Sequence, residues 1–556
     1  MANPLDTQLP NQFGPNTLDA VSLNLLRMGT VAGEYPPSVW FSGITPTDYY
    51  LIYKGSAIVG GCPLVYAPPT STELIRLANS FGVEISTEAE ALNKLAIAGY
   101  YPGNRPFSNL VMSNLALFLT PRNTISYPTS GVNWYDLSGD FIPNPFTIDN
   151  SAMWNQGGWF DFDGTDEYAK TVNQIVNSPS VLTIGANFKR SINNTDTDIE
   201  TVLHCSSTNT VGSSNYWVGT FSTGGGNLIT ATIGANTGGI SYQAGNSGVT
   251  ATNGRWYNVI STWDGSDVRV YVNGVEEATY ALSSYTSTAG APTRVGSSSD
   301  GSNYQFEGGV GDVFINATSS YTEAQVLQNY HQAPIVTDDL VLACDAGNIV
   351  SYESGSITTY NLSQEAAYSG IDGTLNNDVS GSDFGVPHFG FDGTDDFIDF
   401  GDNFDLIGDN ISGFVWGWAD SFTNTTPWID KLKNSGNYRL TSNSSGYLQF
   451  GIRDSSGTFE STTATATPQP TGEWCMIGFT YDNTSKKAIL YKDGVVIGGT
   501  NFTITRGNTG NEFRIGYSEN NSTRLDGRVG QILLYNKKLS KAEVLQNYNA
   551  LATKYK

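Results

Sequence analysis

The sequence is poor in cysteine, histidine and basic residues. Its 556 residues include 4 Cys, 3 His and 28 Lys plus Arg against 52 Asp plus Glu, which leaves a formal net charge of -24. No basic stripe is available to replace the counterions of a phosphate backbone, so we expect no nucleic-acid partner. The thiols are far apart and the histidines lack metal-ligand spacing, which favours buried free thiols and structural histidines. These residues are Cys62, Cys205, Cys344, Cys475, His204, His331 and His388.

Long apolar runs are missing as well. The sequence has no stretch of about 18 apolar residues, so we expect no membrane insertion. The stretch from Met1 to Asp6 has neither the basic n-region nor the apolar h-region of a secretory signal, and no signal peptide is expected.

Glycine and tyrosine are abundant, while charge is sparse. The chain has 61 Gly and 30 Tyr, and only 14% of its residues are charged. Tyrosine favours strands and glycine favours turns, so this composition is typical of a β-rich protein with many turns.

The chain contains a duplication. The stretch Phe162–Asp166 returns unchanged at Phe391–Asp395, and each copy is followed by an acidic residue and an aromatic one. Further matches flank both copies at separations between 218 and 229 residues. Self-similarity over such a distance indicates two copies of one domain. The matched pairs include Asn123–Tyr127 with Asn348–Tyr352, Trp256 with Trp474, and Val326–Tyr330 with Val544–Tyr548.

Each copy shows alternating apolar residues separated by turn signals and ends in one capped helix. The caps are Thr322 with Gln325 and Ser540 with Glu543. Many short strands and one terminal helix indicate an antiparallel sandwich of jelly-roll type. We therefore predict a mainly β protein, in which two tandem antiparallel jelly-roll β-sandwiches, residues 107–334 and 335–556, follow a small α+β N-terminal domain, residues 1–106.

The N-terminal domain does not resemble the repeats. Capping boxes at Thr70 with Glu73 and Thr87 with Glu90 predict two helices, and Tyr49–Tyr53 predicts a short strand. An attachment module and a folded spacer are both compatible with this segment.

The ordered motifs of the two copies resemble the concanavalin A-like lectin/glucanase superfamily, in its laminin-G-like branch. They are the Phe-Asp-Gly-Thr-Asp loop, the Trp256 and Trp474 strands, the turns at Asn273 and Asp493, and the closing helix. The opening at Asp345–Asn348 is most similar to copies carried by tailed-phage virion proteins. The resemblance covers residues from about 110 to 556.

The resemblance implies a non-enzymatic phage virion structural protein, of tail-fibre, adhesin or head-surface type, whose lectin-like domains bind host surface polysaccharide. It would be made in the host cytoplasm and released by lysis, which needs no export signal. We expect its N-terminal domain to contact other virion proteins and the protein to form a homo-oligomer in the virion. One alternative is a capsid decoration or tail spacer protein that contacts only virion subunits, and another is a polysaccharide hydrolase.

The superfamily includes glucanases, which act through paired carboxylates. A retaining glucanase of this fold carries a Glu-x-Asp-x-(x)-Glu strand that aims its carboxylates into one cleft. The motif is absent from the sequence. Consecutive strand residues face opposite ways, so Glu276 and Glu277 cannot act as a pair. We therefore expect no catalytic residues.

The repeated acidic loops could hold calcium, since carboxylates and carbonyls are its ligands. The candidate ligands are Asp163, Asp166, Asp392, Asp395 and Asp396. Alternatively, Asp163 and Asp392 accept backbone N–H bonds in a tight turn. We favour the turn, because the ligands visible in the sequence fall short of the six or more that calcium takes. No cofactor is expected otherwise.

A contact surface is predicted from the aligned strands Asn215–Phe221 and Asn437–Asn443. Alternation would place Tyr438 inward and Arg439 outward, and the same register turns Trp217 and Phe221 outward. Exposed aromatics beside Gly219 would form an apolar slot for a sugar ring or a neighbouring subunit. The alternative is that a loop folds over them.

Overall fold

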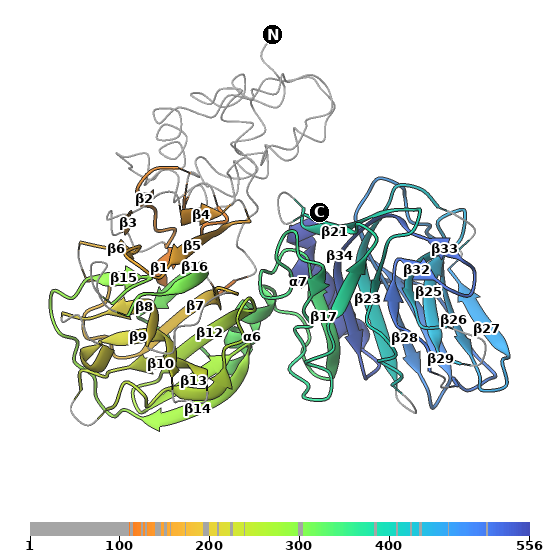
Figure 1. Ribbon diagram of the computed structural model, residues 1–556. Helices are drawn as coiled ribbons and strands as arrows, with labels where there is room; N and C mark the ends of the chain where they lie inside the picture. Colours follow the sequence, from red (N-terminus) through yellow and green to blue (C-terminus); the bar gives the residue numbers. More distant parts are fainter. Residues whose placement is uncertain are drawn as a thin grey trace, which may run out of the picture. The chain divides into compact units, whose positions relative to one another are not determined.

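The computed structural model describes residues 110–555 apart from short internal gaps. The gaps are 112–114, 124–125, 128–129, 139–145, 150–152, 156, 173, 193–198, 208–210, 223–225, 238–239, 299–303, 383–385, 407–409, 423–424, 433–435, 465 and 508–509. The described residues form two compact units, each built on a pair of eight-stranded sheets (Figure 1). The expected N-terminal domain, with its helices and its attachment role, lies outside the described residues. The domain boundaries stay predictions.

The first unit contains sheets A and B. Sheet A has the strand order β14-β13-β12-β7-β16-β5-β4, with β1 also paired to β16, and sheet B has the order β11-β10-β9-β8-β15-β6-β3-β2. The strands of sheet A are β1 (Leu115–Leu119), β4 (Trp154–Asn155), β5 (Trp159–Asp163), β7 (Leu182–Arg190), β12 (Trp256–Trp263), β13 (Asp267–Val272), β14 (Val275–Ala281) and β16 (Glu307–Asn316). The strands of sheet B are β2 (Asn133–Trp134), β3 (Phe146–Ile148), β6 (Ala169–Lys170), β8 (Glu200–Cys205), β9 (Tyr216–Ser222), β10 (Asn227–Ile233), β11 (Asn246–Thr250) and β15 (Thr293–Val295), with a 3-10 turn at η3 (Val211–Ser213).

The second unit contains sheets C and D. Sheet C has the order β20-β21-β34-β23-β28-β29-β30, with β17 also paired to β34, and sheet D has the order β18-β19-β22-β31-β24-β25-β26-β27. The strands of sheet C are β17 (Leu340–Asp345), β20 (Ser380–Ser382), β21 (His388–Asp392), β23 (Ile411–Ala419), β28 (Cys475–Asp482), β29 (Lys487–Lys492), β30 (Val495–Asn501) and β34 (Asp526–Tyr535). The strands of sheet D are β18 (Thr358–Thr359), β19 (Gly373–Asn376), β22 (Phe397–Asp399), β24 (Thr426–Asp430), β25 (Tyr438–Ser442), β26 (Leu448–Arg453), β27 (Phe459–Thr463) and β31 (Arg514–Ile515), beside the hairpin β32 (Tyr517–Ser518) and β33 (Thr523–Arg524).

The two strand orders correspond one for one, which confirms the mainly β fold with tandem antiparallel jelly-roll sandwiches. Phe162 lies on β5 opposite Gly308 of β16, and Phe391 lies on β21 opposite Gly527 of β34. Both phenylalanines are buried. The repeated motif therefore occupies the same strand and the same core position in each sandwich, as the duplication predicts.

The second sandwich has a continuous apolar core between its sheets. Inward residues of β25, including Tyr438 and Leu440, belong to it, while Arg439 between them does not. The Phe450 and Phe479 rings stack across the core with centroids 4.1 Å apart. Alternation along β25 thus places Arg439 on the outer face of sheet D, as the sequence predicts.

Each repeat ends in the predicted helix, α6 (Glu323–His331) or α7 (Lys541–Tyr555). The Thr322 side chain caps α6 in a capping box with Gln325. At α7, the Ser540 N–H donates to Glu543 Oε2 at 2.7 Å and the Glu543 N–H donates to Ser540 Oγ at 3.3 Å. Both predicted caps are confirmed. Neither of these described helices is long and apolar enough to cross a membrane.

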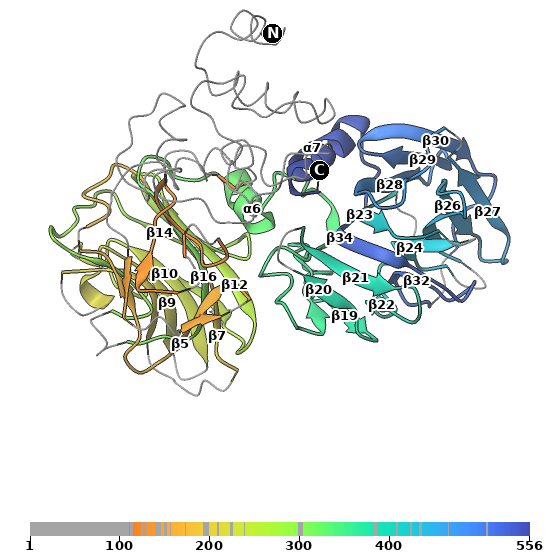
Figure 2. The ribbon, with the colours of Figure 1, turned by 90° about the horizontal axis from the view of Figure 1, so that it is seen from above.

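Helix α7 covers the outer face of sheet C. Its Tyr548 and Tyr555 stack on Trp416 of β23, with ring centroids 5.8 and 4.7 Å away. Figure 2 shows α7 outside the layer that contains β23 and β28, on the side away from β24 and β26. The outer face of sheet D is therefore the face of this sandwich that α7 leaves open.

The rare cysteines and histidines have structural surroundings. Cys205, Cys344 and Cys475 are free and buried, as predicted, while Cys62 lies outside the described residues. His204 Nε2 is hydrogen-bonded to Ser214 Oγ at 2.7 Å. Burial lowers the pKa of His331 to about 4, which keeps its imidazole neutral at physiological pH.

A glycine lies against a core phenylalanine where the two sheets of the second sandwich pack together. A Cβ at Gly516, whose φ is +81°, would lie 2.6 Å from the Phe391 ring, whereas Gly355, with φ +84°, has nothing within 4 Å. We predict that Gly516→Ala destabilises the second sandwich by about 2–4 kcal/mol, because ring displacement adds to backbone strain. Gly355→Ala is the control and should cost only about 1–2 kcal/mol of strain. Equal losses in urea unfolding would show that the contact contributes nothing.

Candidate functional site

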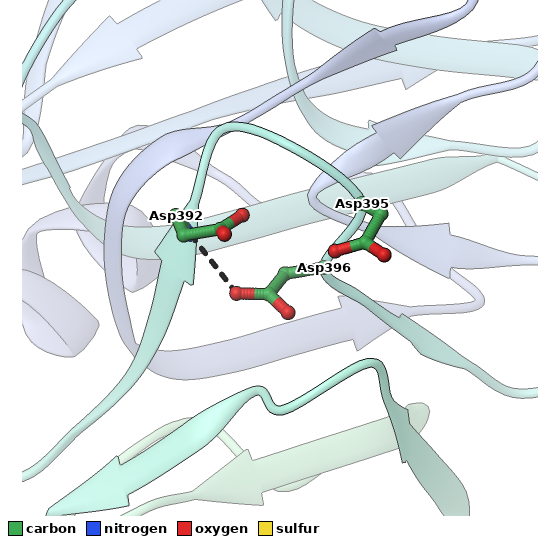
Figure 3. Close-up of side chains that lie close together, drawn as sticks. All are labelled: Asp392, Asp395 and Asp396. Carbon is green, nitrogen blue, oxygen red and sulfur yellow. Dashed lines mark hydrogen bonds between the residues drawn. The ribbon is translucent and has the colours of Figure 1, made fainter.

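The acidic loop of the second sandwich is a tight turn. The Thr394 N–H donates to Asp392 Oδ1 at 2.7 Å, and the Asp392 N–H donates to Asp396 Oδ2 at 2.9 Å, the bond drawn in Figure 3. Gly393 adopts a φ of +76° inside the turn. The loop of the first sandwich repeats this pattern. The Thr165 N–H donates to Asp163 Oδ1 at 2.8 Å, and the Asp163 N–H donates to Glu167 Oε2 at 2.7 Å.

The favoured interpretation is therefore confirmed in its geometry, since Asp163 and Asp392 accept turn N–H bonds. Whether calcium fits this loop depends on how many oxygen ligands the loop can supply. Carboxylate oxygens of Asp392, Asp395 and Asp396 lie within 4.8 Å of one another. Asp396 Oδ1 is buried without a hydrogen-bond partner among the described residues. Three carboxylates supply about half of the six to eight oxygens that calcium takes, so the fit is incomplete.

The turns bring carboxylates together at an electrostatic cost. Burial, together with the charges of the neighbouring Asp392 and Asp395, raises the pKa of Asp396 to about 6 against a backbone bond that lowers it. In the other loop, burial and the Asp163 and Asp166 charges raise the pKa of Glu167 to about 7. Each folded loop holds a proton more tightly than the unfolded chain does, so its contribution to stability falls as pH rises toward these values.

A turn without metal predicts no change in melting temperature when a chelator is added at constant pH, because no bound ligand stabilises the fold. The variant Asp396→Asn retains an acceptor for the Asp392 N–H. It should raise the free energy of unfolding by about 1–2 kcal/mol at pH 8 and by nearly nothing at pH 4, below the raised pKa. Differential scanning calorimetry measures the melting temperature with and without chelator, and the stability of Asp396→Asn at the two pH values. A chelator-induced drop of several degrees, lost in Asp396→Asn, would establish calcium instead.

The outer face of sheet B carries the aromatic residues predicted for contact. Trp217 occupies on β9 the position that Arg439 occupies on β25, so the predicted register holds. The predicted exposure of Trp217 is wrong, since its side chain is 0% exposed. The Trp217 ring packs over Gly219, where an added Cβ would lie 3.0 Å from the ring. The Trp217 indole N–H donates to Thr201 Oγ1 at 3.3 Å.

Tyr242 is the residue that covers Trp217. Its ring meets Trp217 at a centroid distance of 6.3 Å and an angle of 71°, and it meets Phe221 at 5.6 Å. The Ile240–Gly245 loop thus folds over the tryptophan, which is the alternative left open by the sequence. Phe221 and Tyr242 stay half-buried and form the accessible aromatic pair of this face.

The burial of Trp217 changes the expected effect of its removal. Trp217→Ala should destabilise the first sandwich by about 3–5 kcal/mol, because it leaves a cavity beneath Tyr242. Phe221→Ala, on the same strand but half-buried, is the matched control and should lose far less. Amide hydrogen exchange in β8, β9 and β10 measures the loss of stability in both variants. A stable Trp217→Ala protein would mean that Tyr242 does not cover the indole in solution.

The outer face of sheet D carries a row of alternating charge. Asp399, Arg514, Asp430 and Arg439 are cross-strand neighbours on β22, β31, β24 and β25. Arg514 is well paired, with Nε 3.0 Å from Asp399 Oδ2 and Nη1 3.2 Å from Glu519 Oε2. Burial raises the pKa of Asp430 to about 6, although Ser518 and Arg439 act to lower it.

An aromatic residue near the end of the row lies within cation–π distance of two arginines. The Phe459 ring covers Gly451, where a Cβ would lie 2.6 Å from the ring. Arg439 and Arg453 place their guanidinium carbons 4.9 and 5.7 Å from its centroid, as cation–π contacts. Arg439, Arg453 and Phe459 are all half-buried. We call these three residues the arginine–phenylalanine cluster.

Sequence reasoning named Arg439 but missed Arg453, Phe459 and Tyr242. Arg453 and Phe459 end one hairpin and pair across it. Their alternation with Ile452 and Thr462 could have indicated an outward face. Their proximity to Arg439 depends on how β25 pairs with β26 and β26 with β27, which alternation within one strand does not show.

Each unit is a β-sandwich that carries polar and aromatic residues on the outer face of one of its two sheets. Lectins belong to this class of fold. The family model described as "Concanavalin A-like lectin/glucanases superfamily", Laminin_G_3, matches residues 163–325 and 392–545, which is more than half of the chain. This chain belongs to the concanavalin A-like lectin/glucanase superfamily, with two laminin-G-like copies.

Several solved structures are similar to part of this chain at low identity. The binding domain of Paraclostridial Mosquitocidal Protein 1 is 14% identical, with a TM-score of 0.31 over 38% of this chain and 52% of that one. The botulinum neurotoxin serotype D binding domain is 15% identical, with a TM-score of 0.30 over 38% and 52%. Domain 4 of AbnA, an extracellular arabinanase from Geobacillus stearothermophilus solved with arabinotriose, is 16% identical, with a TM-score of 0.29 over 39% and 98%.

The match spans about half the length of the two toxin domains. Likeness at this level says nothing about the ligand of this chain. No curated protein sequence matches it.

Proposed function

We propose that this protein is a non-enzymatic structural component of a phage virion and that its sandwiches bind host surface glycan through the outer faces of sheets B and D. Residues 1–106 would attach it to other virion proteins as a homo-oligomer. The virion assignment rests on the sequence motifs described above. The glycan assignment rests on the superfamily and on the chemistry of the two outer faces.

One observation supports the proposal most strongly, namely the open outer face of sheet D. Helix α7 stacks on Trp416 and covers sheet C, whereas Arg439, Arg453 and Phe459 remain half-exposed on sheet D. Sugar sites combine aromatic surface with side chains that bind hydroxyl groups. Gln449, Ser461 and Thr463 lie beside the arginine–phenylalanine cluster and supply such groups.

The first sandwich offers a second face of different character. Phe221 and Tyr242 present half-buried rings, and the Gln243 amide donates to Tyr242 Oη at 3.1 Å. An aromatic pair with an adjacent amide suits the apolar face of a sugar ring. The two sandwiches would therefore contact glycan with different chemistry on one shared scaffold.

The proposal predicts that the full-length protein binds purified surface polysaccharide of the host and releases no sugar from it. Binding is measured by biolayer interferometry and release by a reducing-sugar assay. A protein that ignores every polysaccharide but binds purified virion particles would be a decoration or spacer protein. Steady release of reducing sugar would make it a hydrolase.

A further inference from the structure

The arginine–phenylalanine cluster brings two guanidinium groups together, with Asp430 as the cross-strand neighbour of Arg439. Among the described residues, neither Arg439 nor Arg453 forms an ion pair or hydrogen bond with a carboxylate. Arg439 Nη1 and Arg453 Nε are buried donor atoms that lack a hydrogen-bond partner in this part of the chain. Burying a charged donor without a partner is costly, so the cluster is poised for an anionic ligand.

Arg514, on the same face of sheet D, differs from the cluster because it forms ion pairs. Arg514 is close to the carboxylates of Asp399, Glu512 and Glu519. Arg439 and Arg453 instead repel one another, and burial together with the Arg453 charge lowers the pKa of Arg439 against the opposing effect of Asp430. The Phe459 ring is within cation–π distance of both guanidinium groups.

We propose that the outer face of sheet D recognises an anionic polysaccharide, with Arg439 and Arg453 as the contacts of an acidic group on the sugar. This inference deepens the proposed function and rests on it. A guanidinium presents a planar fork of donors that matches a carboxylate better than a single ammonium does. The chain carries a net charge of -24, so it repels polyanions except at a locally cationic site.

The surroundings of the cluster favour a sugar over an acidic peptide. Thr441 pairs with Gln449, and Gln449 pairs with Thr463, in the rung next to Arg439, Gly451 and Ser461. Thr441 is buried, whereas Gln449 and Thr463 are half-buried and Ser461 is exposed. Hydroxyl and amide groups in register beside two guanidinium groups suit a ligand that carries both hydroxyls and a negative charge.

The first sandwich cannot form the same site. Trp217 stands where the second copy has Arg439, and Thr232 faces it where the second copy has Gly451. The anionic specificity therefore belongs to the second sandwich, and the two outer faces differ in the charge of the sugar that they accept.

The test uses the full-length protein with polygalacturonate, its fully methyl-esterified form and poly-glutamate as probes. We expect binding to polygalacturonate and at least tenfold weaker binding to the methyl ester, which has the same sugar without the charge. Arg439→Gln and Arg453→Gln should each weaken polygalacturonate binding about tenfold or more, which corresponds to about 1.4 kcal/mol. Arg453→Lys keeps the charge and should lose less than Arg453→Gln.

Arg528→Gln is the matched control. Arg528 lies 4.9 Å from the Trp418 ring as another cation–π contact, but it belongs to β34 of sheet C. Its replacement changes the net charge equally and should leave polygalacturonate binding unchanged. An equal loss in this control would reduce the effect to bulk charge and overturn the inference.

The remaining outcomes separate the inference from the proposed function. Equal binding to the methyl ester, unaffected by Arg439→Gln, would overturn the anionic site and leave glycan binding intact. Binding to poly-glutamate alone would identify an acidic protein surface as the ligand and overturn both. Circular dichroism of each variant confirms that a loss of binding is not a loss of fold.

Discussion

Each sandwich depends on a phenylalanine ring that joins its two sheets at a glycine. Phe162 of sheet A meets Gly296, which follows β15 of sheet B, and Phe391 of sheet C meets Gly516, which follows β31 of sheet D. Both glycines have a positive φ, and a Cβ at either would overlap the ring. Only glycine allows the sheets to approach this closely here.

The shared scaffold leaves the outer faces free to diverge. Inward residues such as Tyr216 and Tyr438 keep the same side-chain type in both copies, because the core constrains their volume. The outward neighbour is a tryptophan in one copy and an arginine in the other. An outward residue is limited only by its ligands and by the loops above it, so duplication can yield one aromatic and one cationic face.

The acidic loops, unlike the outer faces, keep the same residue types in both copies. The turn needs an Asp to accept the Thr N–H and a glycine that tolerates a positive φ, and both copies retain them. The following acidic residue accepts the N–H of the first Asp, and Glu167 and Asp396 both reach it. Both copies therefore keep the residues that the turn requires.

Sequence alone determined the duplication, the sandwich class, the helix caps and the inward or outward side of each residue on β9 and β25. Those features are local or periodic, since side-chain direction alternates with a period of two and capping acts within four residues. The tertiary structure decided what covers each face. Tyr242 reaches Trp217 through a loop, and Arg453 and Phe459 reach Arg439 through neighbouring strands. Contacts of this kind depend on loop paths and strand register, which a one-dimensional pattern does not encode.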